Sequence, residues 1–232
     1  MNVLELGSYL VPAYAGMFLA EQGHTVEKWT QGEDPIQRLR KGDELWRWVN
    51  VGKAVHERHA REVGLLGHGD VDGIVDNIRA ATWERWGIDP AKEARRLRVP
   101  WVSMRDEFNG RSFDAVAQAR AWGDHLGWLP VALGDTAGGL FLAFKLLSMV
   151  NRGQDGHHVL RQATCLAKLV EGNLGVLVER DGKTSPWESS ETYGATGAGV
   201  RVVYRDETTE EPFRDDAWRL ENLRHYASRL AV

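Results

Sequence analysis

The stretch that decides the fold is NVLELGSYLVPAYAGMFLAEQGHTVEKW, residues 2–29. Its first five residues are mostly apolar, as in a short buried strand, and residues 12–23 are typical of a helix. Pro12 suits the first helical turn, and Gly23 suits the left-handed position after the last turn. Residues 25–29 are typical of a second strand. A strand, a helix and a strand within about thirty residues predict a βαβ unit, which implies a parallel sheet with right-handed crossovers.

The alternation of strands and helices continues along the chain. Further strands are expected at 71–76 and 100–104, helices at 82–87, 89–99, 113–122 and 137–150, and a strand that turns into a helix across 157–173. Alternating elements of this kind predict one α/β domain over residues 1–175.

The composition changes after Gly175. Residues 176–199 are rich in Gly, Ser and Thr, which predicts a flexible loop or flap. The remaining residues, 200–232, are expected to form a strand and an amphipathic helix that pack back on the same domain.

Composition and charge exclude several classes of function. The formal net charge of −4 gives no reason to expect a nucleic acid or an anionic membrane as a partner. The most apolar run, 140–150, is interrupted by Lys145 and is too short to span a bilayer. Met1 is not followed by the basic segment of a signal peptide. Together with a single cysteine, Cys165, which fits a reducing compartment, these features predict a cytoplasmic protein.

Most motifs of known catalytic and metal centres are missing from the sequence. The histidines are scattered, and the pair His56 and His59 lacks further ligands, so no metal is expected. Cys165 lies in an apolar helix, as a buried structural thiol does. There is no GxSxG or P-loop motif. The glycines of 194–199 lack the strand-to-helix context that a dinucleotide-binding motif requires.

One acidic residue precedes the helix expected at 137–150. Asp135 lies between glycines in LGDTAGG, residues 133–139. Asp135 or Thr136 can cap the helix by accepting hydrogen bonds from its free amide groups. Alternatively, the positive helix end keeps an uncovered Asp135 carboxylate ionised as a nucleophile toward an activated acyl group, and the glycines let that group approach. The local sequence leaves both interpretations open.

Four segments, in order, resemble the type III CoA-transferases (CaiB/BaiF), the family of formyl-CoA transferase and carnitine CoA-transferase. Residues 2–29 are similar to the opening strand and helix of the family. Residues 32–55 contain counterparts of its GGDP segment and its NRGK turn. Residues 75–104 are similar to the ENFRPGTLERLGL segment and the strand after it. Residues 133–159 are similar to the GDxxxG helix, the GxGQ turn and the strand beyond.

The resemblance implies an open, mostly parallel, Rossmann-like sheet flanked by helices, with residues 1–175 as the large, nucleotide-binding domain of the family. The catalytic aspartate of the family lies in its GD motif, which places that role on Asp135. In the family this carboxylate attacks an acyl-CoA thioester, and an aspartyl-CoA thioester then passes CoA to an acceptor acid. The implied activity is therefore the transfer of CoA between carboxylic acids.

The resemblance also implies which side chains hold coenzyme A, which is a substrate of the family, and it involves no metal. The matching positions are Lys53 in the NRGK turn, Asn77 and Arg79 in ENFR, and Arg85 in LERLG. Lysine and arginine side chains suit the phosphates of CoA. The implied partners are an acyl-CoA and a carboxylic acid, together with a second chain in a homodimer, interlocked as in the family, or in a heterodimer.

The chain also departs from the family. It is expected to be an unusually short member that lacks most or all of the small second domain and the glycine-rich loop over the aspartate. A non-catalytic acyl-CoA-binding or regulatory subunit, paired with a full-length relative, is therefore an alternative, as is a lyase or hydrolase on the same fold. Phe113 takes the place of the histidine of the related α-methylacyl-CoA racemases, which disfavours racemisation because two-base proton transfer needs an acid–base group there.

Overall fold

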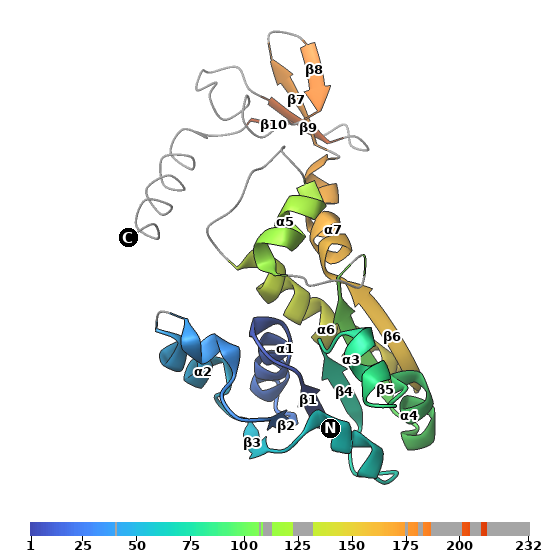
Figure 1. Ribbon diagram of the computed structural model, residues 1–232. Coiled ribbons are helices and arrows are strands. Elements are labelled where there is room, and N and C mark those ends of the chain that lie inside the picture. The colour runs from blue at the N-terminus through green and yellow to red at the C-terminus, as the bar shows by residue number, and fades with distance from the viewer. Residues whose placement is uncertain are drawn as a thin grey trace.

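A six-stranded parallel sheet forms the centre of the chain (Figure 1). The computed structural model describes residues 1–39, 41–106, 108, 113–122, 132–174, 176–180, 183–186, 201–204 and 210–212. The strands of this sheet are β1 (Asn2–Leu6), β2 (Thr25–Thr30), β3 (Ala54–Glu57), β4 (Gly73–Asp76), β5 (Pro100–Arg105) and β6 (Gly156–Arg161). They pair in the order β3-β2-β1-β4-β5-β6, and every pair is parallel. The expected α/β, Rossmann-like fold is thereby confirmed.

Helices connect these strands and cover both faces of the sheet (Figure 1). They are α1 (Leu10–Glu21), the short 3-10 helix η1 (Pro35–Arg38), α2 (Gly42–Val49), the 3-10 helix η2 (Ala60–Leu65), α3 (Ala80–Arg85), α4 (Pro90–Leu97), α5 (Asp114–Trp122), α6 (Leu133–Asn151) and α7 (Gln162–Leu174). Gly23 has a φ of 83°, which confirms the left-handed position predicted after α1.

Strand β1 is mostly apolar because both of its faces are covered, and its one buried charged residue, Glu5, is paired with Lys28 and Lys53. Val3 belongs to a core cluster with residues of α1 and α6. Leu4 and Leu6 belong to a second cluster, which contains Trp83 of α3 and Trp101 of β5. Neighbouring residues of a strand point to opposite faces, so the two clusters lie on opposite sides of the sheet. Continuous apolar runs are typical of strands covered in this way.

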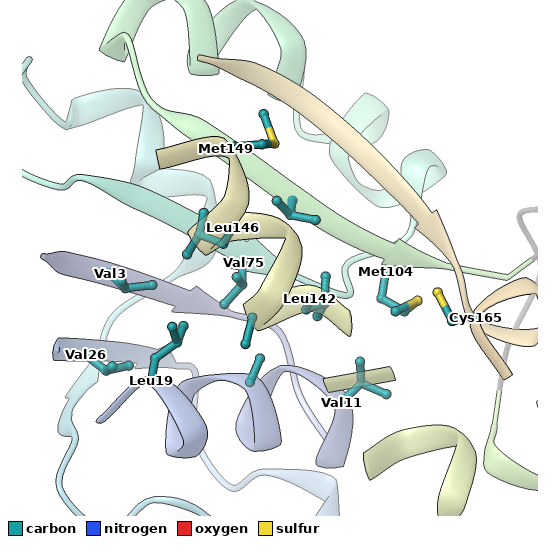
Figure 2. Close-up of a cluster of buried hydrophobic side chains, with 13 residues drawn as sticks. Val3, Val11, Leu19, Val26, Val75, Met104, Leu142, Leu146, Met149 and Cys165 are labelled. Carbon is teal, nitrogen blue, oxygen red and sulfur yellow. The ribbon is translucent and has the colours of Figure 1, made fainter. Parts of the chain in front are cut away.

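Figure 2 shows the cluster that α1 and α6 form over the sheet. Leu142 and Leu146 of α6 lie among Val75 and the side chains of α1, and Cys165 lies at one end of the cluster. Cys165 is only 5% exposed, so its thiol is a buried core group, as predicted.

Helix α6 is longer than predicted and begins at Leu133, four residues before the expected start. With 19 residues, it is long and apolar enough to cross a membrane by length and composition, unlike the shorter run considered in the sequence. Its apolar residues pack instead against α1 and the sheet, including Leu142, Leu146 and Met149. The composition of α6 is therefore explained by its place in the core.

A smaller antiparallel sheet is formed by the C-terminal residues that the structure describes. Its strands are β7 (Val176–Arg180), β8 (Lys183–Pro186), β9 (Arg201–Tyr204) and β10 (Glu210–Pro212), in the order β10-β9-β7-β8. In Figure 1 this sheet lies beyond the end of α7, apart from the six-stranded sheet.

The C-terminal predictions have mixed outcomes. A loop was expected over 176–199, and this expectation is wrong for β7 and β8, because the apolar run of β7 pairs with β9, which lies distant in the sequence. The strand expected near residue 200 is confirmed as β9. The helix expected within 215–230 lies outside the described residues, and the domain division with 200–232 packed on the larger part stays a prediction.

Candidate active site

A cavity of about 600 Å³ opens at the carboxyl ends of the parallel strands. Its wall includes the residues that follow β1 and β4, the two strands between which the order of the sheet reverses. The wall also includes residues at the ends of β2 and β5, residues that follow β3, residues of α3, and the first turns of α6 and α7. In open α/β sheets, ligands bind in the crevice at such a reversal point. The fold therefore places a candidate site where this class of protein binds ligands.

Asp135 lies in this cavity. Because α6 begins at Leu133, Asp135 is the third residue of the helix, and its side chain contributes to the cavity wall. Its Oδ1 accepts a hydrogen bond of 2.9 Å from Nε2 of Gln162, the first residue of α7. The Asp135 carboxylate thus lies at the N-terminal end of α6 and is bound by the side-chain amide of Gln162 in the neighbouring helix α7.

Asp135 does not cap α6, so the capping interpretation of this side chain is wrong. The N-cap residue is Ala132, and no side chain at the cap makes the bond. Thr136 does not cap the helix either, since its hydroxyl donates to the carbonyl oxygen of Leu133. The free amides are bound by Asp114, the first residue of α5, whose Oδ1 lies 2.5 Å from the nitrogen of Gly134 and 3.3 Å from that of Asp135. The Asp135 carboxylate is left to face the cavity.

The protein environment makes Asp135 a weaker acid than an ordinary aspartic acid. Burial raises its pKa to about 6, and the nearby negative charge of Asp114 adds to the rise. The hydrogen bond from Gln162 opposes the rise because it favours the ionised form. With this pKa, roughly nine in ten Asp135 side chains are ionised at neutral pH. The Asp135 carboxylate is therefore more basic than that of an ordinary aspartate, and most Asp135 side chains are still ionised at neutral pH.

Asn77 and Arg79, two of the predicted CoA-binding residues, line the same cavity as Asp135. Asn77 accepts a hydrogen bond of 3.2 Å from the N–H of Ser8, and its Nδ2 donates to the Ser8 carbonyl at 2.8 Å. It thereby ties the loop after β1 to the loop after β4. Gly7 allows this contact, because a Cβ there would lie 2.1 Å from Asn77 Oδ1. Arg79 precedes α3 and is exposed at the rim, where it is open to a ligand.

Lys53 is not brought to the cavity. Its side chain is 0% exposed, and Nζ donates to Glu5 Oε2 at 2.7 Å, to the Ala13 carbonyl at 2.7 Å and to Asn50 Oδ1 at 3.2 Å. A lysine ammonium has three donors, so all are engaged inside the protein. The Glu5 carboxylate also binds Lys28 at 2.6 Å. Lys53 is thus part of a buried ionic cluster rather than a ligand for phosphate in this structure.

Arg85 is also placed away from the cavity. It is the last residue of α3, is exposed, and does not contribute to the cavity wall. Phe113, by contrast, lines the cavity and packs edge-on against Tyr9, with ring centroids 6.1 Å apart. An aromatic ring therefore stands in the cavity at the position that matches the racemase histidine.

Two cavity arginines were missed in the sequence. The Arg58 guanidinium lies 4.0 Å from the centroid of the Trp29 ring, a cation–π contact, and Nε donates to Glu62 at 3.1 Å. Arg105 is buried, and its guanidinium donates to Asp76 Oδ1 at 2.9 Å. Arg58 directly follows β3, and Arg105 ends β5. For Arg105 the signal was its place at the carboxyl end of a predicted strand, whereas Arg58 follows a strand that was not predicted.

Two further polar residues that shape the site were also missed: Asp114 and Gln162. Both begin helices next to α6, and both contact Asp135, one through its backbone N–H and the other through its carboxylate. Their distance along the chain, 21 and 27 residues from Asp135, hid these contacts from local reasoning.

No known family model matches the chain, and no curated protein matches it. Solved structures do match. Rv3272 from Mycobacterium tuberculosis, described as a hypothetical protein, has a TM-score of 0.61 and 19% identity over 74% of this chain and 55% of that one. A CaiB/BaiF family protein from Brucella suis has a TM-score of 0.59 and 18% identity, over 75% of this chain and 55% of that one. The chain thus spans little more than half the length of these structures, and it shares their fold.

Proposed function

We propose that the chain is a member of the type III CoA-transferase (CaiB/BaiF) family and moves CoA between carboxylic acids through a covalent intermediate on Asp135. The observation that carries the proposal is the state of this side chain: it lines the cavity, is not used as a helix cap, and has a pKa raised by burial to about 6. Such a carboxylate is ionised at neutral pH and more nucleophilic than an ordinary aspartate.

The proposed reaction has four steps. The Asp135 carboxylate attacks the thioester carbonyl of an acyl-CoA, and CoA thiolate leaves as an acyl-aspartyl anhydride forms. The thiolate then attacks the aspartyl carbonyl, which releases the donor acid as a carboxylate and leaves an aspartyl-CoA thioester. The acceptor carboxylate displaces the thiolate again and forms a second anhydride. Attack of the thiolate on the acceptor carbonyl gives the new acyl-CoA and restores Asp135. The covalent relay divides one difficult exchange into easier steps.

The cavity offers cations for the phosphates of CoA. Arg79 is exposed at the rim, and Arg58 lies on the wall against Trp29. Guanidinium groups bind phosphate through paired N–H donors. We assign phosphate binding to Arg79 and Arg58, because Lys53 is bound inside the protein and Arg85 does not line the cavity. Asn77 shapes the cavity by joining two loops.

The raised pKa of Asp135 also favours a second candidate function. A carboxyl group with a pKa of about 6 suits general acid–base catalysis near neutral pH, as a lyase or hydrolase acting on a thioester would require. In that case acyl-CoA is consumed without any covalent change of Asp135. We further propose that the protein works in the cytoplasm as a dimer, as a homodimer or with a longer relative.

A transfer assay tests the proposed function. The purified chain is mixed with an acyl-CoA and a different carboxylic acid that carries oxygen-18 in its carboxyl group, and acyl-CoA products are followed by mass spectrometry. The proposal predicts the new acyl-CoA and one labelled oxygen in the Asp135 side chain, because the acceptor oxygen that bridges the second anhydride stays with Asp135. Consumption of acyl-CoA without label in Asp135 favours the acid–base candidate. Binding of acyl-CoA without any turnover identifies an acyl-CoA-binding subunit.

A further inference from the structure

The carboxylate of Asp114 is held against the first turn of α6 by several contacts. Its Oδ1 accepts hydrogen bonds from the N–H groups of Gly134 and Asp135, at 2.5 and 3.3 Å. Its other oxygen, Oδ2, accepts one of 2.6 Å from Nε2 of Gln118, one turn along α5. Both oxygens of Asp114 are thus engaged, and the side chain links α5 to the start of α6.

The sequence at residue 134 fits this contact. A Cβ at Gly134 would lie 2.9 Å from Asp114 Oδ1, which is closer than real Cβ contacts come. A larger residue would therefore push the carboxylate away from the helix amides. Glycine at this position lets Asp114 reach the amide of Asp135 as well as that of Gly134.

The arrangement divides two tasks between two carboxylates. Helix N-termini need acceptors for their free N–H groups, and an aspartate in the first turn is an obvious supplier. Here Asp114 binds those groups, so the Asp135 carboxylate is free to face the cavity and Gln162.

We propose that Asp114 is a positioning residue for Asp135: it caps α6 so that the Asp135 carboxylate stays free, and its negative charge activates that carboxylate. The role of Asp135 as a nucleophile rests on the proposed function, but the contacts between Asp114 and α6 do not depend on a substrate.

The charged groups near Asp135 come from several elements. Asp114 belongs to α5, and Arg105 and Asp106 lie at the end of β5, on the wall of the same cavity. Arg105 is paired with Asp76, and Asp106 forms an ion pair with Arg120 of α5. Asp114, in contrast, bears directly on Asp135, since its charge raises the pKa of that residue after burial. A more basic carboxylate is a stronger nucleophile, provided that it is ionised.

The test separates the charge of Asp114 from its hydrogen bonds. Asp114→Asn keeps an oxygen that can cap α6 and removes the charge, whereas Asp114→Ala removes both. Asp114→Ser supplies a second neutral cap in case the asparagine variant does not fold. Gln162→Leu should change the pKa of Asp135 in the opposite direction, because it removes the hydrogen bond from Gln162 that favours ionised Asp135. Asp155→Asn, which removes an exposed charge just beyond the far end of α6, is the control.

The measurement is the pH titration of the Asp135 carboxyl carbon by NMR, in the full chain without substrate and assigned by its loss in Asp135→Asn. We expect the midpoint to fall in Asp114→Asn or Asp114→Ser, to rise in Gln162→Leu and to stay unchanged in Asp155→Asn. Thermal unfolding should show a clear loss of stability only for Asp114→Ala among the Asp114 variants. An unchanged or higher midpoint in both neutral-cap variants overturns the inference.

The outcomes for Asp114 and for the proposed function are distinguishable. If the midpoint falls as expected but no CoA transfer is found, the proposed function fails and the positioning role stands. If transfer is found, Asp114→Asn should lower kcat, leave KM for acyl-CoA unchanged and move the acid limb of the pH–rate profile to lower pH. Transfer with an unmoved acid limb overturns the activating role of the charge.

Discussion

At the scale of single residues, the site depends on Asp135, which the fold holds in an unfavourable state. The pKa of this carboxyl is raised from 3.8 to about 6, first by burial and then by Asp114. A raised pKa means that the folded state disfavours the ionised form, so stability is lost as the pH rises through 6. Active sites commonly contain groups that, like this buried carboxylate, lower the stability of the fold in exchange for function.

Asp135→Asn is therefore expected to stabilise the protein at neutral pH while abolishing transfer. Each pKa unit corresponds to about 1.4 kcal/mol, so the gain should be on the order of 3 kcal/mol at pH 7.5. The gain should shrink at about pH 5, where more of the Asp135 carboxyl is protonated in the fold. Thermal unfolding of both proteins at the two pH values checks this, and a variant less stable than the wild type at neutral pH would contradict it.

Lys53 carries a second prediction at this scale, as a structural residue. Burial alone would raise the pKa of Glu5, but Lys28 and Lys53 outweigh it and lower the pKa of that carboxyl. Lys53→Met removes one partner from this buried cluster and should cost about 3 kcal/mol of unfolding free energy. The control is Arg38→Met, which removes an exposed ion pair with Glu33 and should change stability by less than about 1 kcal/mol. Urea unfolding of both variants provides the comparison, and equal effects would refute the structural role.

At the scale of elements, the sequence predicted the presence of most helices and strands better than the residues at which they begin and end. Apolar runs located β1, β2, β4 and β5, because burial leaves a clear pattern in the residues, and β6 was expected before α7. Strand β3, whose residues are all exposed, was not predicted. The start of α6 was placed four residues late, and Asp135 or Thr136 was considered as its cap. The true acceptor, Asp114, lies on another helix, and no local pattern shows a contact between helices. Strand β7 was also missed; it pairs with β9, which lies distant in the sequence, and with β8, the next strand along the chain.

The contact between α1 and α6 gives a prediction at this scale. At Gly139, a Cβ would lie 2.6 Å from the Cβ of Tyr14 and 2.8 Å from the Val11 carbonyl oxygen. Gly139→Ala should therefore push the helices apart and destabilise the protein by about 1–3 kcal/mol.

Gly138→Ala is the matched control in the same turn. The nearest atom to a Cβ at Gly138 is Met104 Cε at 3.5 Å, an ordinary contact. Because alanine favours helix more than glycine does, this variant should keep or slightly raise stability. Thermal unfolding of Gly139→Ala and Gly138→Ala measures this difference in stability. Equal losses of stability in both variants would show that α1 and α6 do not pack as described.

At the scale of the whole molecule, the strand order creates the site. The order of the parallel strands reverses between β1 and β4, which are neighbours in the sheet (Figure 1). The residues that follow both strands line the cavity that contains Asp135. The sequence predicted the α/β, Rossmann-like fold and named Asp135, Asn77 and Arg79 as site residues. The structure brings these three residues to the same cavity. The sequence could not show that Lys53 is bound by Glu5 inside the protein or that Arg85 lies outside the cavity wall, because matching a motif does not fix a side chain's partners.

Binding of CoA provides the prediction at this scale. Arg79 lines the cavity, whereas Arg85 is equally exposed but lies outside it. Arg79→Ala should weaken CoA binding by roughly tenfold, about 1.4 kcal/mol, through the loss of a charged hydrogen bond to phosphate. Arg85→Ala should leave the affinity within about twofold. Isothermal titration calorimetry of the two variants measures this, and a larger loss for Arg85→Ala would place CoA elsewhere.

The central claim is that the carboxylate of Asp135 becomes covalently bonded during the reaction. The most direct measurement is peptide mass spectrometry after the wild-type chain is incubated with an acyl-CoA and treated with hydroxylamine, which converts an aspartyl thioester or anhydride into a hydroxamate. We expect a hydroxamate on Asp135 that requires acyl-CoA and is formed to a smaller extent in Asp114→Ala. An unmodified Asp135 in a sample that binds and consumes acyl-CoA would contradict it.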